Sequence, residues 1–244
     1  MICVILAAGY ATRMYPLTEN FPKPLLDVKG KSIIEWLIED VEKTEKVSKY
    51  VIVSNHKFIN KFIEWANGFA MKDKVVVIDD GSTDNDNRLG AVKDIAFAIE
   101  KLNIKDDLMV LAGDNLLDFS LVDFVNYFYK KNSTCVMRYF EGSIDKLRKT
   151  GVALVNSDDK IVKMTEKPEN PESNWAIPPF YIYKKEDIYE IEKGIKEGCP
   201  TDAPGNFISW LCERADIFAY EMPGKRFDIG SIEGYEKIKD SFSL

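Results

Sequence analysis

The first 115 residues alternate short apolar runs with amphipathic helical patterns, and this alternation limits the chain to a narrow class of folds. Strands are expected at residues 1–6, 50–54, 75–78 and 108–112, and helices at residues 32–43, 57–67 and 90–102. Parallel strands joined by right-handed helical crossovers produce this order. The pattern therefore predicts an α/β fold with a Rossmann-like mixed, mainly parallel sheet flanked by helices.

The pattern changes after about residue 133. Strand-like runs at residues 134–140, 152–156, 160–165 and 176–183 are joined by short polar links. We therefore expect a smaller β-rich section here. Because no linker, repeat or low-complexity stretch interrupts the sequence, we predict a single domain over residues 1–244. Its halves are expected at residues 1–132 and 133–244.

Composition excludes several classes of protein. The 244 residues are 45% hydrophobic and 30% charged, which is ordinary for a globular protein. A net charge of −7 argues against nucleic acid as the main partner. No stretch reaches the roughly 20 apolar residues of a membrane span. We expect no signal peptide, because a strand is predicted at the first residues. We therefore predict a cytoplasmic protein without nucleic-acid or membrane partners.

Small residues and two cations follow the first strand. The small residues at positions 7–9 allow backbone N–H groups to approach phosphate closely. Arg13 could grip phosphate oxygens with its planar guanidinium. Lys23 has a proline on each side, and these prolines restrict its backbone. We interpret residues 6–26 as a cradle for a triphosphate.

Two other nucleotide-binding motifs do not match. The Rossmann dinucleotide fingerprint requires glycines where Ala11 and Met14 stand. The phosphate loop of ATPases requires a glycine five residues before the Gly-Lys-Ser triplet at residues 30–32, where Leu25 stands. We interpret that triplet as the turn into a helix.

Residues 4–26 resemble the signature of the NDP-sugar pyrophosphorylases, which are sugar-phosphate nucleotidyltransferases, and weaker similarity continues to the C-terminus. The resemblance implies that a nucleoside triphosphate and a sugar 1-phosphate give a nucleotide-activated sugar and pyrophosphate, through in-line attack on the α-phosphate. It implies Arg13 and Lys23 as catalytic residues. It also implies a Mg²⁺ ion, with Mn²⁺ as a possible substitute, held by Asp114 and Asp228.

The resemblance also assigns contacts with the two substrates, and it implies that residues 1–132 bind the nucleotide and that residues 133–244, with the β-rich section, bind the acceptor. It implies that the nucleotide contacts Leu6, Ala7, Ala8, Gly9, Asp80, Gly81, Gly90 and Asp114. Residues 166–168 resemble the family's Glu-Lys-Pro element, which implies that Glu166 contacts the acceptor and that Lys167 holds its phosphate for catalysis. Two further acceptor contacts are expected from their chemistry: the Tyr181 ring could face a cationic head group, and Asp202 could contact a hydroxyl or such a head group. The expected partners are a nucleoside triphosphate, whose base is left open, and a small phosphorylated acceptor.

The acceptor side departs from the pattern of the sugar enzymes. Residues 177–179, Ile-Pro-Pro, stand where those enzymes have Asn-x-Gly, and proline has no N–H to offer a sugar hydroxyl. A cytidylyltransferase for a phosphocholine-like or phosphonate acceptor is therefore an alternative. A non-catalytic nucleotide-sensing relative is another. A glycosyltransferase would be expected to show Asp-x-Asp, but residues 114–116 lack the second acid. We expect a monomer or a homodimer.

Overall fold

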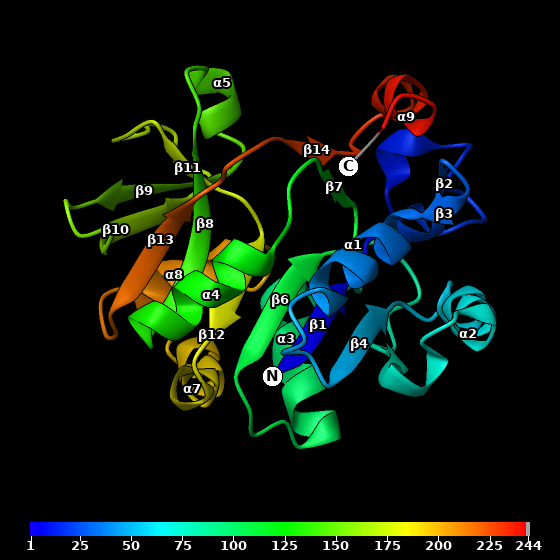
Figure 1. Ribbon diagram of the computed structural model, residues 1–244, viewed down its shortest axis with the longest axis horizontal. Coiled ribbons are helices and arrows are strands. Elements are labelled where there is room, and N and C mark those ends of the chain that lie inside the picture. Colours follow the sequence, from blue (N-terminus) through cyan, green and yellow to red (C-terminus); the bar gives the residue numbers. More distant parts are fainter. Residues whose placement is uncertain (243–244) are drawn as a thin grey trace. The chain divides into compact units, whose positions relative to one another are not determined.

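Strands and helices alternate from the first residues of the computed structural model, which describes residues 1–242 (Figure 1). The chain forms two units, each made of discontinuous segments. Unit 1 contains residues 1–88, 112–122 and those from 223 onward, whereas unit 2 contains residues 89–111 and 123–222. A single domain with halves at residues 1–132 and 133–244 stays a prediction, since these units are delimited differently along the chain.

Unit 1 is built on three parallel strands in the order β1-β4-β5. Its strands are β1 (Ile2–Leu6), β4 (Lys49–Ser54) and β5 (Val75–Asp79), and its helices are α1 (Ile33–Glu42), α2 (Ile59–Gly68) and α9 (Ile232–Lys239). Two antiparallel pairs complete it, namely β2 (Asp27–Val28) with β3 (Lys31–Ser32), and β7 (Asn115–Leu117) with β14 (Arg226–Asp228). The parallel strands and their helical crossovers agree with the predicted α/β fold.

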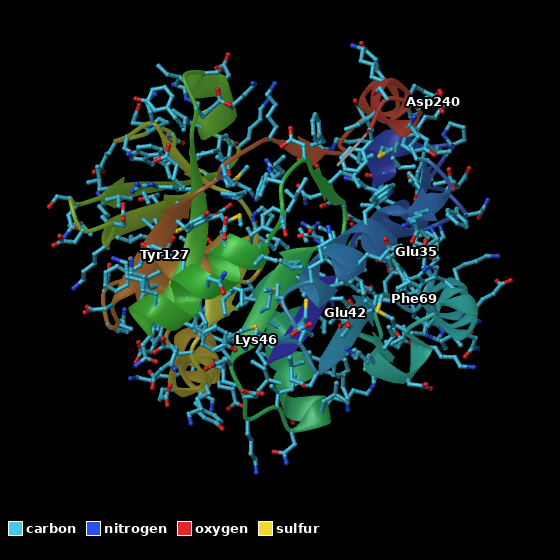
Figure 2. The ribbon with its side chains drawn as sticks, viewed as in Figure 1. Glu35, Glu42, Lys46, Phe69, Tyr127 and Asp240 are labelled. Carbon is cyan, nitrogen blue, oxygen red and sulfur yellow. The ribbon has the colours of Figure 1, made fainter. Side chains whose placement is uncertain are left out.

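Local sequence explains where α1 begins and how its end is fixed. The Ser32 side chain accepts a hydrogen bond from Glu35 N, and the Glu35 side chain accepts one from Ser32 N, so the two form a capping box. At the other end lies Glu42, which is labelled in Figure 2. It accepts hydrogen bonds from Tyr50 Oη at 2.7 Å and Lys74 Nζ at 2.6 Å. The buried tyrosine hydroxyl is thereby satisfied, and α1 is tied to β4.

Unit 2 carries a mixed sheet in the order β10-β9-β11-β8-β12-β6, with β13 parallel to β8. Its strands are β6 (Leu108–Ala112), β8 (Thr134–Phe140), β9 (Gly151–Val155), β10 (Ile161–Glu166), β11 (Trp175–Ile177), β12 (Phe180–Tyr183) and β13 (Ile217–Glu221). Its helices are α3 (Ala91–Leu102), α4 (Val122–Lys131), α5 (Ile144–Leu147), α6 (Lys185–Ile188), α7 (Glu190–Lys196) and α8 (Gly205–Leu211).

The predicted fold class, a mixed sheet flanked by helices with a β-rich section, is confirmed. One detail differs, because the run expected at residues 176–183 is two strands, β11 and β12. Two prolines separate them, and proline cannot donate to a sheet ladder. Phe180 N instead donates to Pro178 O at 2.8 Å in a tight turn. Within residues 1–242, none of the helices has the length and apolar character needed to cross a bilayer.

Ala11 occupies the left-handed region of backbone space, with φ 47° and ψ 39°, just before the 3-10 turn Thr12–Met14. A side chain with a Cβ is strained there by roughly 1–2 kcal/mol, whereas glycine is not. We expect Ala11→Gly to raise the free energy of unfolding by about 0.5–1 kcal/mol, measured by urea denaturation. The control is Ala96→Gly within α3, which should lower it by about 1 kcal/mol. Equal destabilisation by both changes would contradict the strain.

Candidate functional site

The loop that follows β1 is held by the end of β4. Ala7 N donates to Val53 O at 2.9 Å, and the side chain of Asn55 donates to Ala8 O at 2.9 Å. Asn55 is fully buried. A Cβ added at Gly9 would meet no protein atom within 4 Å, so the space over Gly9 is open. The loop therefore presents the exposed Gly9 at the end of a parallel strand, where ligands of such sheets bind.

A close approach of Gly113 to β1 brings Asp114 to the same place. Gly113 N donates to Leu6 O at 3.0 Å. A Cβ on Gly113 would lie 3.0 Å from the Ile5 side chain and 3.1 Å from Leu6 O, so this approach favours glycine. Asp114 is the next residue after Gly113, so its carboxylate lies near the end of β1, although more than 100 residues separate the two in sequence.

Lys23 joins two carboxylates at this point. Its Nζ lies 2.7 Å from Asp114 Oδ2 and 3.7 Å from Asp228 Oδ1. The Lys23 side chain is only 10% exposed, while the two aspartates are 36% and 53% exposed. A mostly buried ammonium is thus compensated by two carboxylates that remain open to solvent. The structure brings together three of the residues that the sequence predicted.

The antiparallel pair β7–β14 sets the position of Asp228. In its register, Asp228 lies opposite Asn115, and Ile229 N donates to Asp114 O at 3.1 Å. Asn115 Nδ2 donates to Asp114 Oδ1 at 2.7 Å, and Arg226 donates to Asn115 Oδ1 at 2.7 Å. Asn115 and Arg226 therefore orient the aspartates. Sequence reasoning did not find these two residues, because nothing in the sequence specifies the pairing of two three-residue strands so far apart.

One hydrophobic cluster contains several sequence neighbours of the charged residues. It contains Met14, Leu26, Val28, Ile33, Leu116, Ile229, Tyr235, Ile238 and Phe242. Four of these lie within three residues of Arg13, Lys23, Asp114 or Asp228 in the sequence. Tyr235 and Ile238 belong to helix α9, and Phe242 follows it. Tyr235 Oη also donates to Asp27 O at 2.7 Å. Packing of α9 therefore stabilises the segments that carry the site.

Arg13 lies on the Thr12–Met14 turn and its side chain is exposed. Among residues 1–242, no carboxylate or hydrogen-bond acceptor is paired with its guanidinium. Its five donors are therefore available to a ligand anion, as the cradle hypothesis requires.

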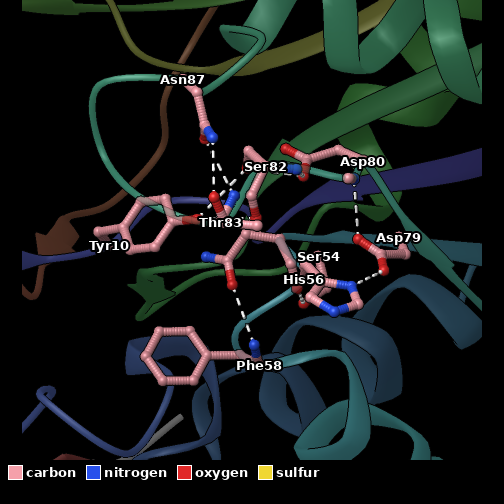
Figure 3. Close-up of polar contacts among 11 residues, drawn as sticks. Tyr10, Ser54, His56, Phe58, Asp79, Asp80, Ser82, Thr83 and Asn87 are labelled. Carbon is pink, nitrogen blue, oxygen red and sulfur yellow. Dashed lines mark hydrogen bonds and ion pairs between the residues drawn. The ribbon is translucent and has the colours of Figure 1, made fainter.

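The loop after β5 forms a polar network with the loop after β1 (Figure 3). Tyr10 Oη donates to Ser82 O at 2.9 Å, while Ser82 N and Oγ each donate to Asp80 Oδ1 at 2.7 Å. Nearby, His56 Nδ1 lies 2.6 Å from Asp79 Oδ2. Asp80 is 9% exposed, so it shapes the loop, and exposed Gly81, with φ 80°, is the more accessible of the two predicted nucleotide contacts. Sequence reasoning missed Tyr10 and Ser82.

The donor set of unit 1 fits a magnesium ion. Asp114 and Asp228 offer hard carboxylate oxygens, and both carboxylates lie within 4 Å of Lys23 Nζ. The described part of the chain holds no cluster of three or more His, Cys, Asp or Glu residues suited to a metal. Mg²⁺ commonly takes one or two carboxylates and completes its shell with water and substrate phosphates. Two partly exposed aspartates meet that requirement.

In unit 2, Lys167 pairs with Asp202. Their Nζ–Oδ2 distance is 3.5 Å, and Asp202 Oδ1 accepts a hydrogen bond from Asn206 Nδ2 at 2.9 Å. The Lys167 backbone is left-handed, with φ 48°, and its N–H donates to Thr150 O at 3.0 Å. This strained conformation is held by the surrounding chain, as occurs at functional sites. The structure therefore brings two predicted acceptor residues together.

Glu166 lies against two glycines. A Cβ on Gly151 would lie 3.0 Å from Glu166 Oε2, and one on Gly205 would collide with the same oxygen. Burial raises the pKa of the Glu166 carboxyl to about 7; the Lys167 ammonium opposes this and the Asp202 carboxylate adds to it. Glu166 therefore changes charge near neutral pH.

We expect this carboxyl to make stability depend on pH. Between its usual pKa of 4.5 and about 7, folded Glu166 keeps a proton that the unfolded chain has released, so this group's contribution to stability falls as pH rises through that window. Glu166→Gln removes the titration. The Tm of the variant minus that of the wild type should therefore be larger at pH 8 than at pH 5, by differential scanning calorimetry. Exposed Glu213→Gln should show equal differences, and equal differences for Glu166→Gln would refute the shift.

Two of the predicted substrate contacts, Tyr181 and Gly90, are packed against other residues of unit 2. Tyr181, in β12, is 2% exposed and packs against Tyr183, with ring centroids 6.0 Å apart, which favours a packing role over acceptor contact. Gly90 precedes α3 with φ 91°, and the backbone of residues 201–202 lies against it. Glycine is therefore required at position 90 for two independent reasons.

Comparison with known proteins gives a consistent result. Residues 2–242 match the family described as Nucleotidyl transferase. The bifunctional protein GlmU of Methanococcus aeolicus is 33% identical over 234 residues, which cover 94% of this chain and 51% of that protein. The glucose-1-phosphate adenylyltransferase of Fervidobacterium nodosum is 25% identical, covering 96% of this chain and 59% of that protein. The chain spans about half the length of the curated relatives it matches.

Solved structures show the same fold. A UDP-glucose pyrophosphorylase complexed with UDP-glucose aligns with a TM-score of 0.82 at 22% identity, covering 98% of this chain and 97% of that one. A putative glucose-1-phosphate thymidylyltransferase from Bacillus anthracis aligns with a TM-score of 0.80 at 20% identity, covering 100% and 97%. At these identities the likeness concerns the fold alone.

Proposed function

The chain belongs to the nucleotidyl transferase family, and we propose that it transfers a nucleotidyl group from a nucleoside triphosphate to a sugar 1-phosphate and releases pyrophosphate. One observation carries the proposal. Lys23, mostly buried, lies between Asp114 and Asp228 at the end of β1, next to a backbone loop with open space over Gly9. Cation, carboxylates and exposed backbone are the groups that phosphate transfer requires.

The reaction needs little covalent chemistry from the protein. An oxygen of the acceptor phosphate attacks the α-phosphorus, the bond from this phosphorus to the bridging oxygen breaks, and pyrophosphate leaves with the electron pair. The acceptor phosphate is already an anion, so no general base is needed. Backbone N–H groups of Ala8 and Gly9 and the Arg13 guanidinium bind the triphosphate oxygens, while Lys23 stabilises charge that develops in the transition state.

Asp114 and Asp228 would hold Mg²⁺, for which Mn²⁺ can substitute. When bound, the ion supplies charge neutralisation for the phosphate oxygens. Asn115 fixes the orientation of Asp114, because its amide donates to Oδ1 and leaves Oδ2 toward Lys23. The Lys23 ammonium can then pair either with the carboxylates or with a substrate phosphate, whichever lies nearer.

Unit 2 would supply the acceptor contacts. Lys167 binds the acceptor phosphate as a point charge, and Asp202 restrains this lysine from the other side. Glu166 offers a carboxyl to a hydroxyl of the acceptor. Such positioning converts a bimolecular encounter into an oriented one, which is worth up to about 7–11 kcal/mol in well-oriented systems.

The test is a panel of triphosphates with Mg²⁺ and phosphorylated acceptors. ATP, CTP, GTP, UTP and dTTP are each combined with glucose 1-phosphate, glucosamine 1-phosphate and phosphocholine, and pyrophosphate release is measured. The proposal expects release that requires both a triphosphate and a sugar 1-phosphate. A protein that releases none with any pair is a non-catalytic relative, and the proposal is then wrong.

A second candidate is a cytidylyltransferase for a small non-sugar phosphate. The tight turn at residues 178–180 favours it, because Phe180 N is already bonded to Pro178 O and neither proline has an N–H for a sugar hydroxyl. A higher kcat/KM with CTP and phosphocholine than with every sugar 1-phosphate in the same panel would establish this candidate. The cytoplasmic location and the monomeric or dimeric state stay predictions.

A further inference from the structure

The charged residues that are expected to meet the triphosphate carry no net charge among them. The positive charges of Arg13 and Lys23 are balanced by the carboxylates of Asp114 and Asp228, and Lys23 already lies against both aspartates. The whole chain has a net charge of −7, so its overall field does not attract an anion. A triphosphate would therefore bind more tightly if a further cation lay beside the loop that follows β1.

Lys57 belongs to a turn that is bonded to this loop. Asn55, two residues earlier, donates from its side chain to Ala8 O at 2.9 Å and accepts a hydrogen bond from Phe58 N at 3.0 Å. The ring of Phe58 also lies against that of Tyr10, with centroids 6.5 Å apart (Figure 3). Because the residues on both sides of Lys57 contact the loop, the backbone of Lys57 is held beside it.

The ammonium of Lys57 faces aromatic rings instead of a carboxylate. Its Nζ lies 5.2 Å from the ring centroid of Phe58 and 5.8 Å from that of Tyr15. Within residues 1–242, this ammonium forms no ion pair and no hydrogen bond. Ring faces attract a cation but do not use its N–H donors, so these donors stay available to an anion. Tyr15 directly follows the turn that carries Arg13, and its ring thereby places the Lys57 ammonium next to that turn.

We propose that Lys57 binds the outer phosphates of the triphosphate, those that leave as pyrophosphate, and that Tyr15 is the positioning residue for its ammonium. This deepens the proposed function and rests on it, because there the Arg13 guanidinium binds triphosphate oxygens beside the same turn. Lys57 adds a positive point charge to a group of residues whose own charges cancel. Its contact forms equally with the bound triphosphate and with the transition state, so its loss should raise the triphosphate KM and leave kcat nearly unchanged.

Two nucleotides distinguish the outer phosphates from the rest of the substrate. One is a non-reactive α,β-methylene triphosphate of the nucleoside that is active in the panel, and the other is the monophosphate of that nucleoside. Binding of each with Mg²⁺ is measured by isothermal titration calorimetry. In Lys57→Gln, the Kd of the triphosphate analogue should rise about 10-fold, as for a weaker hydrogen bond to a charged group. The Kd of the monophosphate, which lacks the outer phosphates, should stay within about 2-fold.

Three further variants complete the test. Lys57→Arg keeps the charge and should bind both nucleotides as the wild type does. Tyr15→Leu should raise the Kd of the triphosphate analogue about 3-fold, whereas Tyr15→Phe, which keeps the ring, should not. Lys61→Gln, in α2, is the matched control. Lys61 pairs with Glu64 at 3.7 Å, and its replacement changes the net charge by the same amount, so both Kd values should stay at those of the wild type.

The outcomes separate the role of Lys57 from the function it rests on. If the wild type is active but Lys57→Gln binds the triphosphate analogue as tightly, only the role of Lys57 is wrong. Equal weakening of the triphosphate analogue and the monophosphate would place Lys57 at the base, ribose or α-phosphate and would also overturn it, as would equal weakening by Lys61→Gln. If the wild type releases no pyrophosphate with any substrate pair, the proposed function is wrong, and the role of Lys57 falls with it.

Discussion

Replacement of Lys23 by alanine is expected to lower kcat by about 10²–10³-fold, the usual cost of one group that stabilises charge in the transition state. The side chain is 10% exposed, and its Nζ lies 2.7 Å from Asp114 and 3.7 Å from Asp228, so its charge acts where the two carboxylates meet. The ammonium interacts more strongly with the developing charge than with bound substrate, and kcat should therefore fall more than KM rises. Steady-state pyrophosphate release is the measurement.

Lys31→Ala is the matched control for this change. Lys31 also forms an ion pair, with Glu39, but its side chain is 40% exposed. Exposed pairs contribute about 0–1 kcal/mol, so activity and stability should change little. A Lys23→Ala protein that keeps kcat within a few-fold of the wild type, with an intact fold by circular dichroism, would remove Lys23 from the mechanism.

Conversion of Asp114 or Asp228 to asparagine is expected to raise the Mg²⁺ concentration for half-maximal activity by 10-fold or more. Each change keeps the shape of the side chain and removes a hard anionic ligand. Activity of the wild type should vanish with EDTA and return with Mg²⁺ or Mn²⁺. The titration is followed through pyrophosphate release at saturating triphosphate.

Exposed Asp73→Asn, in the turn Lys72–Lys74, serves as the control and should titrate like the wild type. The double change Asp114→Asn with Asp228→Asn should be hardly more severe than the worse single change if both hold one ion, because residues in one network are not additive. A single variant with the wild-type Mg²⁺ dependence is not a ligand of that ion.

Helix and strand positions of the parallel part followed closely from the sequence. The helix expected at residues 32–43 is α1, Ile33–Glu42, because Ser32 and Glu35 form a capping box and the apolar residues repeat at helical spacing. The helix expected at residues 90–102 is α3, Ala91–Leu102, which begins after Gly90. Strong local signals of this kind act over only a few residues, so short sequence windows contain them.

Long-range pairings did not follow from the sequence. Asp228 reaches Lys23 through the β7–β14 pairing, and Asp114 through the approach of Gly113 to β1. Two three-residue strands carry no periodicity that would specify a register. Likewise, Asn55 was missed because its role depends on the carbonyl of Ala8, which lies 47 positions earlier. Tyr181 was expected at the acceptor because aromatic residues suit a cationic group, yet its strand buries it.

The central claim is that the chain transfers the α-phosphoryl group of a triphosphate, with its nucleoside, to a phosphorylated acceptor. The most direct measurement follows two labels in parallel reactions with Mg²⁺ and glucose 1-phosphate, one with [α-³²P]UTP and one with [γ-³²P]UTP, and repeats them with the other triphosphates and with each acceptor of the panel. For at least one triphosphate, the α label should appear in a nucleotide sugar and the γ label in pyrophosphate. If for every triphosphate the γ label instead appears on the acceptor or as inorganic phosphate, or if neither label moves, the proposed reaction is wrong.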